Sequence, residues 1–310
     1  MKRKPLVILL ALLLDWSMGD PPNQLHPVAW MGKAIAWGEK CCQLRQPWAQ
    51  FGQGALLTLA EGTSVILLVS WLKKMLAALP APISIISEAL LLKMTFSGRG
   101  LHRAAGDVER ALQQGDIAAA RHWLSWHLVS RDVSQLGEDE IAAATIESLA
   151  ENASDGLVAP WFWYMLAGLP AAYFYRFANT TDAMLGYRDA RREWLGKFPA
   201  RLDDALNLIP ARLTALLIIA ASWFTRGDGA RAWRVWRRDA RLTASPNAGH
   251  PMSAMAGALG VRLEKRENYT LGAEFPPPGQ THLARSRQML SVIILLAAGF
   301  TILVTFRSRD

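Results

Sequence analysis

Carboxylates, carboxamides and arginines gather at helix-like spacings in three stretches of this sequence. The stretches read ESLAENASDG from Glu147, NTTDAMLGY from Asn179 and ARLDDALNLIPARLTA from Ala200. Each borders a segment apolar enough to enter a bilayer, where polar and ionisable side chains are costly unless they face a protein interior. The pattern therefore predicts a membrane-embedded functional site built from carboxylates and guanidinium groups.

The first stretch and Glu140, which precedes it, place several acidic residues on one helical face. Glu140, Glu147 and Glu151 recur at near-helical intervals, and Asp155 continues the stripe where Asn152–Gly156 is expected to loosen the helix. Stacked carboxylates repel each other unless a cation relieves them. Mg²⁺ carrying a nucleotide would do so, because Mg²⁺ takes few carboxylates and completes its shell with phosphate oxygens. A solvated acidic face is the alternative; we favour it for Glu140 and favour function for Glu147 and Glu151.

The third stretch alternates acidic and basic groups on neighbouring helical faces. Arg201 and Asp204 share one face with Arg212, and Asp203 shares the next with Asn207. The Asp–Asp pair with Asn207 could hold a metal or orient an amine, and the arginines could bind phosphate or carboxylate in a fork. A buried salt-bridge network between helices explains the same spacing equally well.

The second stretch and a later turn carry weaker signals. Asn179, Thr180 and Asp182 are residue types typical of a turn or helix N-cap. Ser245–Gly249 reads as a turn before a helix at Pro251, whose backbone N–H groups could bind an anion. The small residues that follow allow close helix packing.

Two further segments have a less specific interpretation. Asp15, Asp20 and His26 lie in a loop stiffened by Pro-Pro and His-Pro steps, where a lone histidine is more often structural than catalytic. Arginines interleaved with Trp233 and Trp236 predict a helix at a membrane surface, with attraction to anionic lipid favoured over substrate binding.

Composition narrows the class of protein. The 310 residues are 51% hydrophobic, carry a net charge of +8 and include 13 Trp. Basic residues and Trp gather at membrane surfaces, and no nucleic-acid-binding motif accompanies the charge. The only cysteines, Cys41 and Cys42, are adjacent, which argues against a disulfide framework and a structural zinc site. No Walker A loop, Rossmann fingerprint, nucleophile elbow or zinc-protease motif is present.

The apolar segments predict an all-α, polytopic membrane protein with about four to six membrane-entering helices. The N-terminal apolar run, 5–14, is too short for a standard span and lacks a cleavage site, so we expect it to be retained. Proline and charge compromise several of the remaining segments, and 289–306 is the cleanest. The five remaining apolar segments are Gly54–Leu72, Met75–Lys93, Leu157–Tyr175, Ala205–Phe224 and Met289–Phe306.

The polar connections predict orientation and the internal organisation of one domain, 1–310. Thr95–Ser154 reads as two amphipathic helices with a break at Gly115–Asp116, and Arg226–Gln288 as a basic helix, a turn and a small-residue helix. Residues 273–288 read as a Pro-rich linker, and no strand is expected. The basic Arg226–Gln288 connection is predicted to be cytoplasmic. Simple alternation puts Arg176–Asp204 on the opposite side, unless the segments between 157 and 224 form a re-entrant pair.

These motifs, in their order, resemble the adenosylcobinamide-phosphate synthase family of cobalamin biosynthesis, the CobD/CbiB membrane proteins. The resemblance runs from about Asp15 to Gly272 and also includes GDPPNQLHPVAWMG and SPNAGHPMSAMAGALGVRLEK. NTTDAMLGY departs from the family's commoner NTLDSMLGY at Thr181 and Ala183, while Asn179, Thr180 and Asp182 match.

The resemblance implies an ATP-dependent acid–amine ligase in the bacterial inner membrane, with its site facing the cytoplasm. Adenosylcobyric acid would be joined to (R)-1-amino-2-propanol O-2-phosphate, or to ethanolamine phosphate, giving adenosylcobinamide phosphate. ATP and Mg²⁺ are the expected cofactors, because forming an amide from a carboxylate needs activation. The expected partners are the two substrates, the lipid bilayer and other late enzymes of the pathway, with no nucleic acid. A corrinoid transporter and a non-catalytic membrane sensor on the same fold are the alternatives.

Each candidate residue then has an expected role. Asp203 or Asp204 would accept the ammonium proton of the amine, and His26 with Asp20 would close the site. The candidate catalytic residues are Glu147, Glu151, Asp203, Asp204 and His26. The candidate substrate- and phosphate-binding residues are Asp20, Asn152, Asn179, Asp182, Arg201, Asn207, Arg212, Ser245 and Asn247. The candidate Mg²⁺ ligands are Glu147, Glu151 and Asp155.

Overall fold

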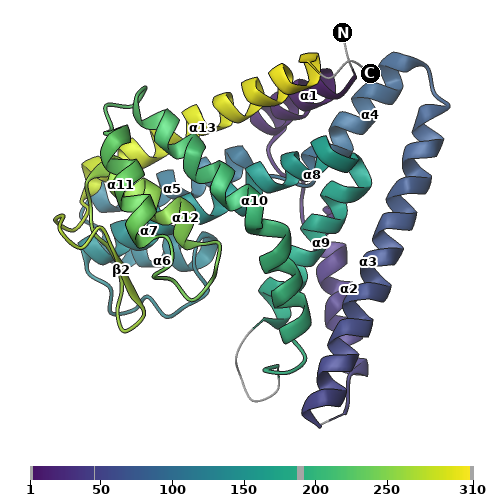
Figure 1. Cartoon of the computed structure of the whole chain (residues 1–310), viewed down its shortest axis with the longest axis horizontal. Helices are drawn as coiled ribbons and strands as arrows, with labels where there is room; N and C mark the ends of the chain where they lie inside the picture. Colours follow the sequence, from purple (N-terminus) through teal and green to yellow (C-terminus); the bar gives the residue numbers. More distant parts are fainter. Residues whose placement is uncertain (1–2, 45, 187–191, 308–310) are drawn as a thin grey trace. The chain divides into compact units, whose positions relative to one another are not determined.

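The computed structural model describes residues 3–44, 46–186 and 192–307, which are almost entirely helical (Figure 1). The fold separates into two compact units, each built from segments distant in sequence: unit 1 is 1–97, 159–207 and 301–310, and unit 2 is 98–158 and 208–300. The sequence predicts a single domain, which stays a prediction.

Unit 1 is a helical bundle. Its helices are α1 (Arg3–Met18), α2 (Pro27–Cys41), α3 (Pro47–Ala77), α4 (Ala81–Lys93), α8 (Ala159–Ala167), α9 (Leu169–Leu185) and the first part of α10 (Lys197–Ser222). Within it α3 packs along α9, α1 packs on α4, and α2 contacts α9 (Figure 1). Prolines in the first turn begin α2, α3, α4 and α9, where the missing N–H costs nothing.

Unit 2 surrounds one completely buried helix. It contains α5 (Gly98–Gln113), α6 (Ile117–His127), α7 (Glu138–Ala153), the π-helical turn η1 (Ser154–Val158), the rest of α10, α11 (Gly229–Asp239), α12 (Gly249–Leu259), β1 (Leu263–Lys265), β2 (Tyr269–Leu271) and most of α13 (Gln280–Arg307). Every residue of α12 is buried, chiefly against α11 and α7. Its small side chains allow this close packing, as the sequence predicts.

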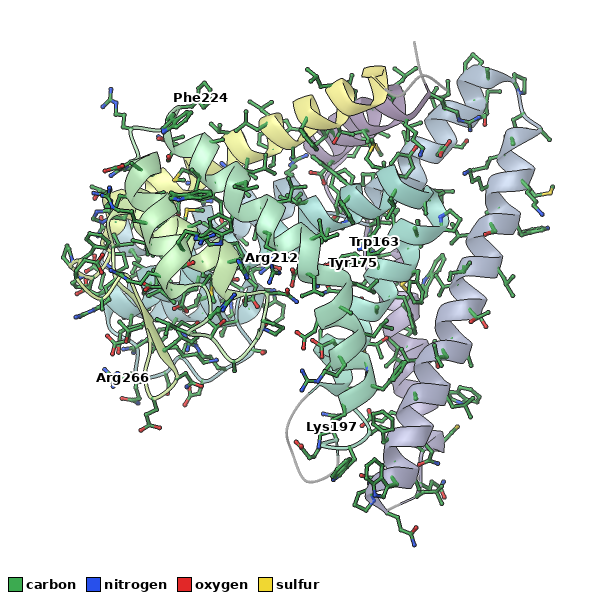
Figure 2. The ribbon with its side chains drawn as sticks, in the orientation of Figure 1. Trp163, Tyr175, Lys197, Arg212, Phe224 and Arg266 are labelled. Carbon is green, nitrogen blue, oxygen red and sulfur yellow. The ribbon has the colours of Figure 1, made fainter. Side chains whose placement is uncertain are left out.

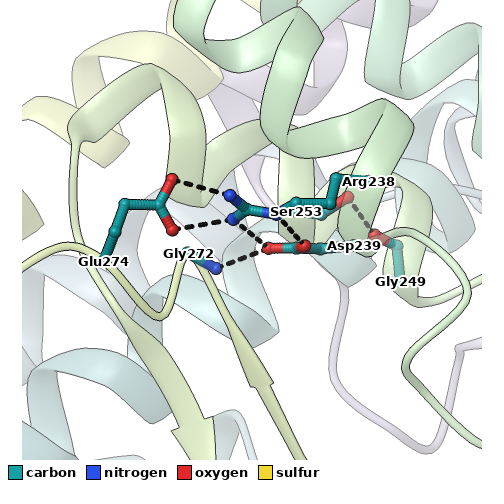
Figure 3. Close-up of polar contacts among 6 residues, drawn as sticks. All are labelled: Arg238, Asp239, Gly249, Ser253, Gly272 and Glu274. Carbon is teal, nitrogen blue, oxygen red and sulfur yellow. Dashed lines mark hydrogen bonds and ion pairs between the residues drawn. The ribbon is translucent and has the colours of Figure 1, made fainter.

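The pair β1–β2 corrects the expectation that the chain has no strands. The two strands form an antiparallel hairpin with Glu264 opposite Thr270. A side-chain network fixes the chain just after it: Arg238 of α11 binds Glu274 and Asp239, and Asp239 accepts the N–H of Gly272 at 2.7 Å (Figure 3). Such short strands carry little periodicity, so tertiary anchoring rather than sequence pattern determines them.

Three helices in the described part of the chain are long and apolar enough to cross a membrane: Pro47–Ala77, Lys197–Ser222 and the Gln280–Thr301 part of α13. They include most of the predicted segments 54–72, 205–224 and 289–306. The predicted Met75–Lys93 segment is wrong as one span, because α3 ends at Ala77 and α4 has only 13 residues. Leu157–Tyr175 is also divided, by Gly168 with φ of 81° and by Pro170.

Pro210 does not break α10, contrary to the doubt raised by the sequence. Proline has no N–H to donate to the carbonyl of Leu206 four residues earlier. The indole Nε1 of Trp163, which is labelled in Figure 2, donates to that carbonyl instead, at 3.2 Å. A tertiary hydrogen bond therefore replaces the missing helical one, and the helix continues to Ser222.

The polar connections mostly follow the predicted plan. The break at Gly115–Asp116 is confirmed, with Asp116 capping α6 through the N–H of Ala119. Gly137 precedes the start of α7, so this region holds three helices rather than two. Helix α13 begins at Gln280, and the second half of the predicted 273–288 linker is therefore helical. The three prolines at 276–278 keep the preceding residues out of the helix.

Candidate functional site

The polar residues of α9 and α10 in unit 1 form one continuous network. Asp203 is buried, with an exposed fraction of 9%. Its Oδ1 accepts from the amide of Asn179 at 3.3 Å, and its Oδ2 accepts from the amide of Asn207 at 3.1 Å. Arg176 donates to Asn179 at 3.4 Å, and the hydroxyl of Tyr175 donates to Asn207 at 2.8 Å. Both oxygens of Asp203 therefore have neutral amide donors whose orientation is itself fixed.

The predicted turn or N-cap at Asn179–Asp182 is wrong. All of these residues lie inside α9, which runs to Leu185. The hydroxyls of Thr180 and Thr181 donate to the carbonyls of Arg176 and Phe177 one turn earlier, which satisfies them within the helix. This helical placement points Asn179 at Asp203, while Asp182 is half-buried near the end of the helix.

Arg201 and Asp204 lie at the edge of this network. The Arg201 side chain is 83% exposed and approaches Asp204 at 3.8 Å, as an i,i+3 pair. A solvated pair at this spacing contributes little. Arg201 therefore does not take part in a buried salt-bridge network between helices, and phosphate binding by Arg201 stays a prediction.

A buried lysine organises the loop that follows α1. The Lys93 ammonium, at the end of α4, lies 3.6 Å from Asp15 and donates to Asp20, which also accepts from Ser97. Burial raises the pKa of Asp20, but these two hydrogen bonds outweigh it and leave the pKa below its usual value. Lys93 was not singled out as a site residue from the sequence, where it ends the predicted segment Met75–Lys93.

His26 caps α2. Its Nδ1 accepts from the N–H of Val28 at 3.2 Å, so a neutral His26 carries its proton on Nε2. Burial lowers the pKa of His26, and Lys93 and Arg176 lower it further against the opposing effect of Asp20. Nδ1 of His26 therefore serves the helix cap, and closing of the site by His26 stays a prediction.

Glu147 is the central ionisable group of α7 in unit 2. It is buried, with an exposed fraction of 6%, and its Oε1 has no hydrogen-bond partner in the described part of the chain. Its Oε2 lies 3.6 Å from a guanidinium nitrogen of Arg131. Burial raises the pKa of Glu147 to about 7, against the opposing effect of Arg131, and nearby Glu151 adds to the increase. Glu147 therefore exchanges its proton near neutral pH.

The hydroxyl of Tyr269, from β2, also faces this carboxylate. Burial, together with the neighbouring charges of Glu147 and Glu151, raises the pKa of Tyr269, so the phenol stays protonated. Its hydroxyl also lies 3.9 Å from the sulfur of Met252, to which it can donate. Neither Tyr269 nor Arg131 was singled out from the sequence. Their partners are distant in the chain and no short motif connects them.

The other acidic residues of this face differ in burial and contacts. Glu140 accepts from the N–H of Gly137 at 2.9 Å and pairs with Arg266 at 2.5 Å, which confirms its expected structural role. Glu151 is exposed and Asp155 is half-buried. At Asp155 the helix widens into the π-helical turn η1 rather than loosening as predicted. Asn152 donates to the carbonyl and hydroxyl of Ser148, one turn earlier.

No group of three His, Cys, Asp or Glu residues in the described ranges is arranged to hold a metal ion. Arg131 beside Glu147 disfavours a cation at that carboxylate. Glu151 and Asp155 are left as the candidate ligands, and one or two carboxylates suffice when Mg²⁺ takes its remaining ligands from phosphate and water.

The predicted anion-binding turn precedes α12. The Ser245 hydroxyl oxygen accepts from the N–H groups of Asn247 and Ala248 at 3.2 and 3.3 Å, which fixes the turn. Arg212 of α10 donates to the side-chain oxygen of Asn247 at 3.5 Å and to the carbonyl of Leu208 at 2.6 Å. The turn and Arg212 are therefore brought together, as a shared phosphate site requires. His250, directly after this turn, was missed.

The basic helix predicted to meet lipid is partly used within the protein. Arg231 of α11 donates to the carbonyls of Gly257 and Ala258 at 2.6 and 3.2 Å, closing the end of α12. Arg238 takes part in the network of Figure 3, whereas Arg234 and Arg237 are exposed.

Comparison with known proteins gives a consistent result. A family model described as CobD/Cbib protein matches residues 8–294. A cobalamin biosynthesis protein CobD from Dehalococcoides mccartyi (strain CBDB1) is 45% identical over 272 residues, covering 88% of each chain. A probable cobalamin biosynthesis protein CobD from Methanothermobacter thermautotrophicus is 42% identical over 269 residues, covering 86% of each chain.

A cobalamin biosynthesis protein CobD from Klebsiella pneumoniae is 39% identical over 265 residues, covering 84% of this chain and 82% of the relative. No solved structure matches the chain. The family model spans nearly the whole sequence, including the Asp203 network and the Glu147 face. The chain belongs to the CobD/CbiB family.

Proposed function

We propose that this protein acts in cobalamin biosynthesis as an amide-forming enzyme. It joins the free propionate carboxyl of adenosylcobyric acid to aminopropanol phosphate, or to ethanolamine phosphate, and gives adenosylcobinamide phosphate. Support for the pathway comes from the family match and from relatives named as cobalamin biosynthesis proteins. Support for the reaction comes from the chemistry of the two polar clusters.

The observation that carries the proposal is the state of Glu147. An aminoalkyl phosphate arrives as an ammonium ion and loses a proton before its nitrogen can attack a carboxyl carbon. A carboxylate with a pKa of about 7 and a buried oxygen that lacks a hydrogen-bond partner is suited to take that proton. Arg131, at 3.6 Å, keeps the ionised form accessible, and Tyr269 orients the carboxylate.

Asp203 has a different role in this proposal. Both of its oxygens accept from amides at 3.1 and 3.3 Å, so it acts as a fixed carboxylate that orients a cationic group. Asp204 borders it, and Asp182 lies on the neighbouring helix. In unit 1, Asp20 accepts a hydrogen bond from the buried Lys93, and the charges of both groups act on His26.

The phosphate of the amine substrate is assigned to Arg212 and the Ser245–Asn247 turn. A guanidinium beside a turn fixed by its own hydroxyl offers positive charge and hydrogen-bond donors in one place. ATP is the proposed activating substrate. Mg²⁺, held by Glu151 and Asp155, would neutralise phosphate charge when bound.

The three apolar helices support a membrane protein, and we propose an inner-membrane location with the site facing the cytoplasm. The basic 226–288 connection, which includes α11, supports that orientation. Four to six membrane-entering helices remain part of the proposal. Association with other late enzymes of the pathway would keep the corrinoid at the membrane surface.

The test is amide formation by the detergent-purified protein. Adenosylcobyric acid, aminopropanol phosphate and Mg-ATP are supplied, and product mass is followed together with ADP or AMP. Product that needs all three reactants supports the ligase. A folded protein that binds corrinoid but gives no product contradicts it and favours the transporter alternative.

A further inference from the structure

The neighbouring Trp236 fixes the tautomer of the His250 side chain. The indole Nε1 of Trp236 lies 2.9 Å from Nδ1 of His250, and the two rings meet edge to face at a centroid distance of 6.0 Å. An indole N–H can only donate, so Nδ1 is the acceptor. The single proton of the neutral imidazole is therefore on Nε2, which makes it a hydrogen-bond donor.

The imidazole is also kept neutral. His250 is 9% exposed, and burial lowers its pKa to about 4, with Arg212 and Arg241 adding to the decrease. No carboxylate is among the charged groups that act on this ring in the described part of the chain. Its Nε2 makes no hydrogen bond to the described residues, whereas Nδ1 is satisfied by Trp236.

The groups around His250 favour an anion. Arg212, from α10, and Arg241, just after α11, are the two charged groups among the described residues that act electrostatically on this ring, and both lower its pKa. Arg212 also contacts Asn247 of the Ser245–Asn247 turn, at 3.5 Å, and Asn247 is buried. Two guanidinium groups and an unused N–H donor, brought together without a carboxylate, form an arrangement suited to phosphate oxygens.

We propose that His250 is a fixed Nε2–H donor in an anion site, with Arg212 and Arg241 supplying the charge, and that the site takes the phosphate group of a phosphate monoester. Identifying that monoester with the amine substrate rests on the proposed function, whereas anion binding does not. A neutral donor gives the site a hydrogen bond whose strength does not change between pH 6 and 8. Trp236 is a positioning residue because it acts only through the imidazole.

Two substitutions separate this role from simple packing. His250→Asn retains an oxygen near the position of Nδ1 that can accept from Trp236, but places no donor at the position of Nε2. His250→Gln places an amide N–H near the position of Nε2 and loses the acceptor for Trp236. Packing alone predicts that the two variants behave alike, whereas the proposed donor predicts that they differ.

The probe is inorganic phosphate, titrated into the detergent-solubilised full chain, with chloride at the same ionic strength as the control. We expect His250→Asn to weaken phosphate binding roughly tenfold, the effect of losing one hydrogen bond to a charged group. His250→Gln should stay within about threefold of the wild type. Equal weakening by both variants, or no change in His250→Asn, overturns the proposal.

A measurement on the wild-type protein does not depend on variant folding. Nitrogen NMR of protein labelled in its six histidines reports which ring nitrogen carries the proton, and the signal lost in His250→Gln assigns His250. We expect Nδ1 unprotonated and Nε2 protonated from pH 6 to 8, with phosphate shifting the Nε2 signal. A proton on Nδ1, or a charged ring at pH 6.5, overturns the proposal. Failure of amide synthesis with these signals intact contradicts the proposed function alone.

Discussion

Two buried carboxylates, Asp203 in unit 1 and Glu147 in unit 2, have different surroundings within their own units. Asp203 has an amide donor on each oxygen, and those amides are fixed in turn by Arg176 and Tyr175. One oxygen of Glu147 has no hydrogen bond to the described residues, and its other oxygen lies 3.6 Å from the guanidinium of Arg131. Two carboxylates of similar burial therefore differ in hydrogen bonding: each oxygen of Asp203 has a neutral donor, whereas one oxygen of Glu147 has none.

The largest expected effect is on turnover. Glu147→Gln keeps the shape of the side chain but cannot accept a proton, and we expect amide formation to fall about 10²- to 10⁴-fold. The wild-type rate should rise with pH through about 7 as Glu147 ionises. Product mass in the amide-formation assay measures both.

Glu140→Gln is the matched control, since Glu140 lies on the same helix but pairs with Arg266. Its turnover should stay within about twofold of the wild type, because surface pairs contribute little. Turnover of Glu147→Gln near the wild-type rate would remove Glu147 as the base.

The same isosteric change should alter stability in opposite directions at the two sites. The pKa of Glu147 is about 7 in the folded state against 4.5 for a solvated glutamate, so the folded state binds the proton more tightly. The free energy of unfolding therefore falls as pH rises from 4.5 to 7 and is level above. At pH 8 we expect Glu147→Gln to be more stable than the wild type by about 1–3 kcal/mol, with a smaller difference at pH 5.

Asp203→Asn should instead lose about 1–3 kcal/mol, because its new NH₂ group would face the NH₂ of Asn179 or Asn207. The side-chain amides of Asn179 and Asn207 cannot flip without breaking their hydrogen bonds to Arg176 and Tyr175. Thermal unfolding in detergent with EDTA compares the variants, and a shift of a few degrees is expected in each direction. Destabilisation of both variants at pH 8 would show that Glu147 is not strained by ionisation.

The smallest expected effect concerns access from the two sides of the membrane. Ala183 in unit 1 and Ala244 in unit 2 are exposed, so a cysteine at either position can react with an impermeant thiol reagent. With Cys41 and Cys42 replaced by serine, we expect both positions to be protected in intact cells and labelled in inverted vesicles. Labelling of Ala183→Cys from outside would contradict a cytoplasmic site that includes α9.

Part of this organisation could be predicted from the sequence because it depends on local patterns. The apolar stretches of α3 and α13, the break capped by Asp116 and the small-residue helix α12 depend on hydrophobicity, capping chemistry and side-chain size. The motifs of Asn179, Asp203 and Glu147 were also visible, because their residue types and spacing are unusual beside apolar segments.

The remaining features depend on partners distant in the chain. Continuity of α10 through Pro210 depends on the indole of Trp163, and α9 extends through a segment whose composition suggested a cap. Lys93, Arg131 and Tyr269 belong to no recognisable motif, yet each lowers the pKa of a carboxylate against the effect of burial. Local propensity does not encode such contacts.

The sequence by itself therefore determined the mainly helical fold class, the apolar stretches of α3 and α13, and the polar motifs that connect the chain to its family. Only the tertiary structure decided the state of each polar group. It gave Asp203 two amide donors, left one oxygen of Glu147 without a hydrogen bond, and placed the proton of His250 on Nε2. The physical reason is that protonation and hydrogen bonding depend on burial and on partners many residues away, which only folding brings together.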